Sequence, residues 1–173
     1  MKASNSIKTI FLLIFMTLGT SVMFNACKDD DPCDGVECKN GGTCNDGNCA
    51  CLTGYEGTDC GTETRSKFVA AYTCTNTCFP GTSYSSSASP SSVDVSKFII
   101  TNMGNVSGLD VVARATGGSI FVIDNQVVTD NGGDSWTMSG QGSLVGNIIT
   151  ANVTYVYNPT SNTLTCTETW SKQ

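Results

Sequence analysis

Apolar and polar side chains alternate at every second position through much of the C-terminal two thirds of the chain. The alternation is clearest in residues 68–74, 109–115, 135–139, 149–155 and 163–170. A period of two places successive side chains on opposite faces of a β-strand. No segment keeps a helical period over three turns. The pattern therefore predicts an all-β domain whose strands each bury one face.

Short segments rich in glycine and asparagine separate these runs, at residues 116–118, 130–134, 145–147 and 157–162. Such residues favour the tight turns that join neighbouring antiparallel strands. One buried face per strand and short connections predict an antiparallel β-meander, which suits either a closed barrel or a two-sheet β-sandwich. The serine-rich segment 83–92 is expected to form a mobile loop.

Residues 33–60 have a different pattern, with few large apolar side chains and six of the ten cysteines of the chain. The spacing lacks the paired Cys-x2–4-Cys of zinc sites and the Cys-x-x-Cys of redox sites. A segment this short cannot bury enough apolar surface to fold without cross-links. We therefore expect a small module held by disulfides, and we expect no metal site and no cofactor.

The ending of this segment, Cys-x-Cys-x2-Gly-Tyr-x-Gly-x2-Cys at residues 49–60, resembles that of EGF-like modules, as does Asn-Gly-Gly-Thr-Cys at residues 40–44. Pro32 stands where calcium-binding members of that family carry a glutamate, and the loop 45–48 lacks their aromatic residue. The resemblance therefore implies a scaffold without a specific calcium site. It also implies three disulfides, Cys33–Cys44, Cys38–Cys49 and Cys51–Cys60.

The N-terminus has the pattern of a signal peptide, with two lysines followed by an apolar stretch at residues 10–18. Phe-Asn-Ala-Cys at residues 24–27 resembles a bacterial lipoprotein box, which implies cleavage before Cys27 and acylation (for example with palmitate) of that residue. The alternative is an ordinary cleaved signal peptide. Two or more acyl chains are sufficient for stable membrane anchoring.

An acidic segment follows the cysteine directly. It is similar to the export signal of surface lipoproteins of Bacteroidota, which implies a lipid-anchored protein of the outer membrane that faces the cell exterior. The residues of this signal would be Lys28, Asp29, Asp30 and Asp31.

Residues 139–147, followed by a threonine-rich strand, resemble part of the lipocalin-like barrels found in bacterial lipoproteins. The resemblance implies that the meander closes into a barrel, with the β-sandwich as the alternative. Three cysteines remain for this domain. Similarity to such lipoproteins favours a Cys78–Cys166 disulfide, with Cys74 free and buried; Cys74–Cys166 and Cys74–Cys78 are the alternatives. The expected organisation is a signal peptide (1–26), an acidic tether (27–32), an EGF-like domain (33–60), a linker (61–66) and an all-β domain (67–173).

Composition limits the function. The chain has no histidine, a net charge of −6 and only two arginines, Arg65 and Arg114. It therefore lacks the commonest catalytic base and a basic surface for nucleic acid. We expect a protein that is not an enzyme.

Several side chains of the all-β domain are candidates for chemistry. We expect Glu168 to be solvated at a barrel mouth, and we expect two aspartates to form a hairpin turn. Four aromatic residues are expected in the core, with a ligand pocket as the alternative. These residues are Asp130, Asp134, Trp136, Tyr155, Tyr157 and Trp170.

The expected function is non-catalytic binding or adhesion at the cell surface, with anchoring to the membrane through the acylated Cys27. The EGF-like module would serve as a spacer or contact surface, and the partner would be an unknown protein or glycan. The alternative is a carrier that holds an apolar or glycan ligand in the barrel cavity. The least favoured hypothesis is a hydrolase that uses two carboxylates.

Overall fold

The computed structural model describes residues 31–173, of which Gly35–Gln173 form one compact unit. The predicted signal peptide, Cys27, Lys28, Asp29 and Asp30 lie outside the described residues.

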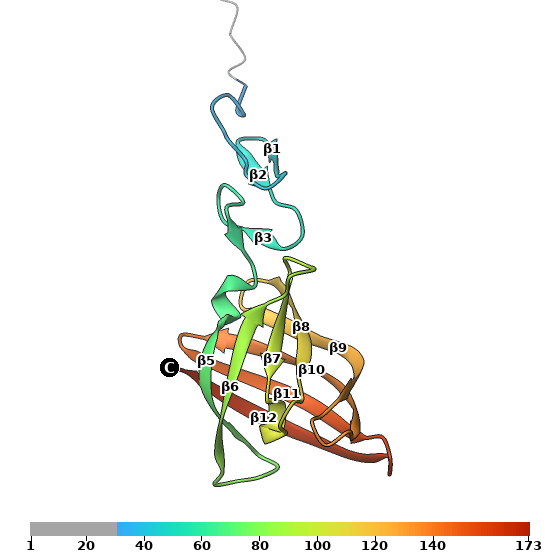
Figure 1. The fold of residues 1–173 in the computed structure, drawn as a ribbon. Coiled ribbons are helices and arrows are strands. Elements are labelled where there is room, and N and C mark those ends of the chain that lie inside the picture. The colour runs from blue at the N-terminus through green and yellow to red at the C-terminus, as the bar shows by residue number, and fades with distance from the viewer. Residues whose placement is uncertain (1–30) are drawn as a thin grey trace, which may run out of the picture. The chain divides into compact units, whose positions relative to one another are not determined.

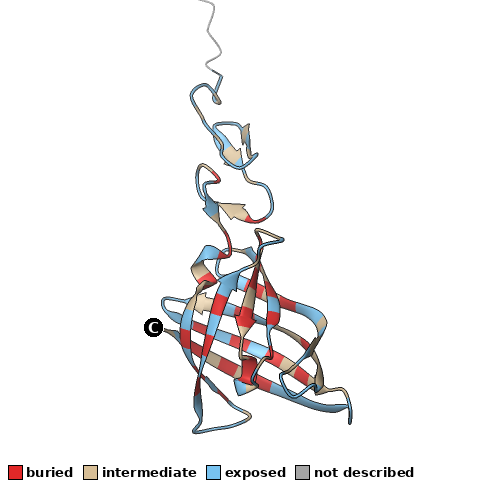
Figure 2. Ribbon diagram, in the orientation of Figure 1, coloured by how far each residue is buried: buried red, intermediate tan, exposed pale blue. Residues whose placement is uncertain are grey.

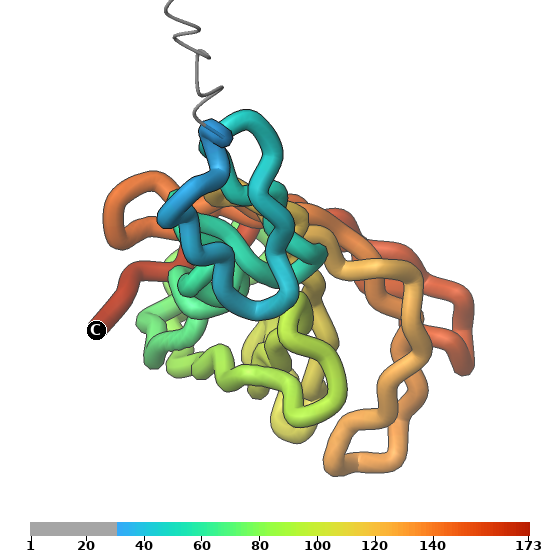
Figure 3. Tube along the Cα trace, turned by 90° about the horizontal axis from the view of Figure 1, so that it is seen from above, coloured from blue at the N-terminus to red at the C-terminus, as the bar shows by residue number. Residues whose placement is uncertain are grey.

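Eight antiparallel strands close into a barrel, in which each strand pairs with the next along the chain and the last pairs with the first (Figure 1). The predicted meander and its closure into a barrel are therefore confirmed, and the sandwich alternative was wrong. The C-terminus lies beside the first strand, where the Gln173 amide donates to the Ala71 carbonyl (Figures 1 and 3). The strands are β5 (Ala70–Asn76), β6 (Ser83–Pro90), β7 (Lys97–Thr101), β8 (Val111–Gly117), β9 (Ile120–Thr129), β10 (Ser135–Val145), β11 (Ile148–Tyr157) and β12 (Asn162–Lys172).

Burial alternates along the strands, as the period-two pattern predicts (Figure 2). The expected loop at residues 83–92 was wrong, because β6 occupies most of it. Its inward positions are Tyr84, Ser86 and Ala88. Ser86 is too polar and Ala88 too small to extend the apolar signal of Tyr84 into a recognisable alternation. Ser86 is accommodated because its hydroxyl donates to the Thr101 carbonyl at 2.7 Å. A serine can thus occupy a core-facing position when a backbone acceptor lies beside it.

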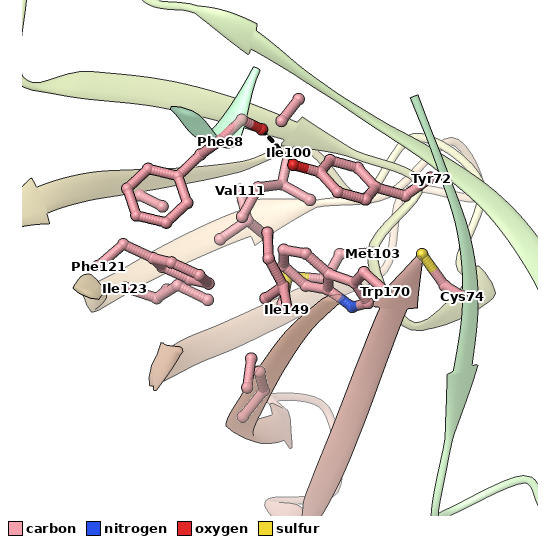
Figure 4. Packing of buried hydrophobic residues seen from close by; sticks show 14 of the residues in the cluster. Phe68, Tyr72, Cys74, Ile100, Met103, Val111, Phe121, Ile123, Ile149 and Trp170 are labelled. Atoms are coloured by element: carbon pink, nitrogen blue, oxygen red, sulfur yellow. Dashed lines mark hydrogen bonds between the residues drawn. The ribbon is translucent and has the colours of Figure 1, made fainter. Parts of the chain in front are cut away.

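Aromatic side chains fill the barrel near the start of β5 (Figure 4). Phe68, at the end of the short 3₁₀ helix η1 (Ser66–Phe68), enters the core and stacks on Phe98 with ring centroids 5.2 Å apart. Phe121 contacts three rings, those of Phe68 at 5.3 Å, Phe98 at 5.5 Å and Trp170 at 5.8 Å. The interior at this end is therefore packed rather than hollow.

The packing around Gly142 shows why the sequence near residue 140 is rich in glycine. It pairs with Phe121 on β9 and with Ala151 on β11. A Cβ atom at this position would lie only 2.4 Å from the Phe121 ring. The glycine thus leaves the space into which the ring packs, a role that any larger residue would abolish.

A disulfide-rich module precedes the barrel, and its residues from Gly35 onward belong to the same compact unit. It contains the disulfides Cys38–Cys49 and Cys51–Cys60, and both Cys33 and Cys44 are also disulfide-bonded. Cys78–Cys166 forms in the barrel, whereas Cys74 is free and buried. Cys38–Cys49, Cys51–Cys60 and Cys78–Cys166 are pairs that the sequence resemblances implied. The short strands of the module are β1 (Thr43–Asn45), β2 (Asn48–Ala50), β3 (Tyr55–Glu56) and β4 (Thr62–Glu63).

Candidate ligand site at the barrel mouth

Two adjoining pockets lie at the barrel end where β5 finishes. Their volumes are about 280 Å³ and about 60 Å³. Both are lined by Asn76, Phe79, Gly104 and Val106. The larger is completed by Thr82, Tyr84 and Asn105, and the smaller by Trp136, Tyr155, Leu164 and Cys166. An apolar, partly aromatic lining with a few polar groups is typical of small-molecule sites.

The β5–β6 connection forms one wall of this mouth. Asn76 ends β5, and its side-chain oxygen accepts a hydrogen bond from the Phe79 amide at 2.8 Å. The Cys78–Cys166 disulfide joins the same connection to β12. The Phe79 side chain is nevertheless 56% exposed. A large aromatic side chain thus stands at the pocket rim on a segment that is covalently fixed.

The 3₁₀ turn η2 (Met103–Asn105) also lines the pockets, through Gly104 and Asn105. Gly104 has φ +64°, and a Cβ atom there would lie 3.0 Å from the Tyr155 hydroxyl oxygen. Glycine is therefore required both for the left-handed backbone and for the close approach of the turn to Tyr155.

Glu168 lies beneath the pockets and is fully buried. Three side chains donate to its carboxylate. They are the Tyr84 hydroxyl to Oε2, the Tyr155 hydroxyl to Oε1 at 2.5 Å, and the Trp170 Nε1–H to Oε2 at 3.2 Å. The expectation that Glu168 is solvated was wrong, because these three donors replace water around the buried carboxylate.

The buried carboxylate changes the acidity of its neighbours. Burial, and then the charge of Glu168, raise the pKa of both Tyr84 and Tyr155 far above the usual value for a phenol. The same two causes raise the pKa of Cys74 to about 12. Both phenols and this thiol therefore keep their protons at neutral pH, so Cys74 lacks the thiolate needed for nucleophilic chemistry.

The remaining residues that the sequence singled out lie in the barrel core, at the pocket rim or in a turn. Trp170 is in the core, whereas Trp136 is half-buried and lines the smaller pocket. Asp130 forms the predicted turn, since its Oδ1 accepts from the amides of Gly132 and Asp134 and its Oδ2 accepts from the Trp136 indole at 2.9 Å. The turn thereby orients the indole that lines the pocket.

Two other predicted residues do not themselves line the mouth pockets. The Tyr157 hydroxyl donates to Asp134 at 3.0 Å, and its ring packs on that of Trp136 with ring centroids 5.0 Å apart. Asp31 accepts a hydrogen bond from the Cys33 amide at 2.9 Å.

Sequence reasoning missed the pocket residues Asn76, Phe79, Tyr84 and Val106. Tyr84 carried a usable signal, since it is the only large apolar residue in the run Ser-Tyr-Ser-Ser-Ser-Ala-Ser at residues 83–89. Asn76 is the polar last residue of β5. Phe79 and Val106 lie in connections, where no periodicity indicates which way a side chain points.

Within residues 31–173, no group of three acidic or cysteine side chains is placed to hold a metal ion. None of the helices in that range has the length and apolar character needed to cross a membrane. No protein-family model matches this chain. No solved structure matches it significantly.

Proposed function

We propose that this protein is a non-catalytic, lipid-anchored binding protein of the cell surface, with its ligand site at the mouth of a lipocalin-like barrel. The observation that carries the proposal is the pair of adjoining pockets, whose walls combine Phe79, Val106 and Trp136 with the polar side chain of Asn76. The EGF-like module would be a spacer or contact surface. The anchor and surface location rest on the lipoprotein box at Cys27 and on the acidic residues after it.

Two further observations support binding at the mouth rather than catalysis or deep enclosure. Glu168 is the only buried acidic side chain in residues 31–173, so no second inward carboxylate is available there for hydrolysis of a glycosidic bond. Phe68, Phe98 and Phe121 fill the other end of the barrel. A ligand is therefore accommodated at the mouth, and the carrier alternative with a continuous internal cavity is less favoured.

Binding of the neutral fluorescent probe N-phenyl-1-naphthylamine to the full chain tests the site. We expect a saturable rise in fluorescence with one probe per chain. Val106→Trp fills both pockets and is expected to weaken binding at least about tenfold, because the apolar walls are no longer available. Val112→Trp, on the outer face of β8, is the matched control and is expected to change the affinity less than about twofold. Absence of saturable binding, or equal binding by both variants, would contradict the proposal.

Surface labelling of intact cells tests the location. A Cys27→Ala variant should lose membrane attachment, since the acyl chains supply the apolar surface that enters the bilayer. Replacement of Asp29, Asp30 and Asp31 by alanine should leave the protein attached but no longer accessible to a membrane-impermeant label. If both variants are labelled at the cell surface as strongly as the wild type, the anchoring and export parts of the proposal are wrong.

A further inference from the structure

The side chain of Asn76 is buried at the barrel mouth, but only one end of its amide group is hydrogen-bonded. It is 8% exposed and lines both mouth pockets. The Phe79 backbone amide donates to it at 2.8 Å. Because a backbone N–H can only donate, the atom that it contacts must be the side-chain oxygen Oδ1. The other terminal atom of Asn76 is therefore the amide nitrogen Nδ2.

This nitrogen carries two N–H donors, and it has no acceptor within residues 31–173. The one fully buried side-chain polar atom without a partner in that range is the Thr64 hydroxyl oxygen, and Thr64 lines neither mouth pocket. Asn76 Nδ2 is therefore in contact with solvent, in the pockets that its side chain lines. A donor on a side chain that is otherwise buried gains from an acceptor on a ligand, because few water molecules can reach it.

The other polar side chains of the larger pocket are less selective. Thr82 and Asn105 are exposed, so water satisfies their polar groups whether or not a ligand is bound. None of the residues that line the two pockets is charged. A charged ligand would therefore lose hydration without gaining an opposite charge, which favours a neutral ligand.

The smaller pocket sets a second requirement. Its walls, which include Val106, Trp136 and Leu164, present only apolar surface. The two pockets share four lining residues, including Asn76, so one molecule can reach both. An apolar group is stabilised there by its removal from water, whereas a polar group would lose its hydrogen bonds. The ligand is therefore expected to combine a hydrogen-bond acceptor with an apolar group.

We propose that the barrel mouth recognises a small neutral carbonyl compound. Its oxygen accepts a hydrogen bond from Asn76 Nδ2 in the larger pocket, and its apolar group extends into the smaller one. A carbonyl suits this site better than a hydroxyl, because a hydroxyl proton would need an acceptor that the apolar walls do not offer. This inference rests on the proposed function, because it names the ligand class of the same site.

Acetophenone and α-methylstyrene form a matched pair of probes, since the second has a methylene group in place of the carbonyl oxygen and keeps the shape. Their affinities for the full chain are measured by displacement of N-phenyl-1-naphthylamine. Asn76→Asp keeps an oxygen for the Phe79 amide and removes both N–H donors. We expect this change to weaken acetophenone at least about fivefold and α-methylstyrene less than about twofold. Each compound is compared between the two proteins, so the different hydration of the compounds cancels.

Asn105→Asp is the matched control, because it places the same charge on an exposed side chain of the larger pocket. It should change the affinity for acetophenone by less than about twofold, since water solvates that side chain. Benzoate, a charged acceptor of similar size, is expected to bind the wild-type protein at least about tenfold more weakly than acetophenone.

A further measurement does not depend on the folding of a variant. In the wild-type chain labelled with ¹⁵N, acetophenone should move a side-chain amide proton of Asn76 downfield in a saturable way, because that proton becomes hydrogen-bonded, and α-methylstyrene should not.

Equal weakening of both compounds by Asn76→Asp, an Asn76 amide resonance that does not respond to acetophenone, or benzoate binding as tight as that of acetophenone would overturn this inference. If the naphthylamine probe binds but acetophenone does not displace it, the carbonyl inference alone is wrong. If the naphthylamine probe does not bind either, the proposed function fails as well.

Discussion

Replacing Phe121 by alanine is expected to lower the free energy of unfolding by about 3–5 kcal/mol, the usual cost of deleting a buried aromatic ring. Phe121 is fully buried and contacts three other rings, those of Phe68, Phe98 and Trp170. Gly142 on the adjacent strand has no side chain that could move into the vacated space. The surrounding barrel is closed, so it cannot collapse around the cavity. Denaturant unfolding at equilibrium measures the loss.

Val127→Ala is the matched control, because Val127 lies on the same strand and its side chain is 66% exposed. That change should alter the free energy of unfolding by no more than about 0.5 kcal/mol. A loss below about 1 kcal/mol for Phe121→Ala would mean that the ring is not part of a tightly packed core.

The double variant Cys78→Ala/Cys166→Ala is expected to lose about 4–5 kcal/mol of stability, because the bridge removes chain entropy from the unfolded state. The sequence separation of 88 residues makes this the longest loop closed by the disulfides described above. The bridge also fixes the segment that carries Phe79, so probe binding at the barrel mouth should weaken together with stability. Denaturant unfolding of the wild-type and variant chains under non-reducing conditions measures the difference in their free energies of unfolding.

Cys74→Ala controls for the loss of a buried sulfur without the loss of a cross-link. Its expected cost is about 1 kcal/mol, close to that of one buried methylene group. If the double variant loses no more stability than Cys74→Ala, the disulfide does not stabilise the fold by restricting the unfolded chain.

The sequence predicts a strand well where its apolar and polar residues alternate clearly, and poorly where they do not. β11 and β12 pair alternating apolar residues with threonines, so their extent and buried faces followed from the pattern. β6 did not, because its inward positions include Ser86, whose burial depends on an acceptor supplied by β7. Barrel closure was favoured over a sandwich only by resemblance, since the pairing of β12 with β5 joins segments far apart in the sequence.

The candidate site was less predictable. Glu168 stood out as a carboxylate on an apolar face, but its burial depends on Tyr84, which lies 84 residues away in the chain. Trp136 and Tyr155 were recognised as core or pocket residues, whereas Phe79 and Val106 lie in connections without a pattern. Contacts of this kind arise from the closed topology, which local sequence does not encode.

The central claim, that a ligand binds at the barrel mouth, is tested most directly by the indole N–H resonances of the full chain labelled with ¹⁵N. The protein has two tryptophans, of which Trp136 lines the pocket and Trp170 lies in the core. On titration with N-phenyl-1-naphthylamine, the Trp136 resonance is predicted to shift in a saturable way, with the dissociation constant obtained from the fluorescence of the probe. The Trp170 resonance should shift less, because Trp170 is buried in the core and does not line the pockets. If the Trp136 resonance does not shift while the probe binds the chain, the barrel mouth is not the ligand site.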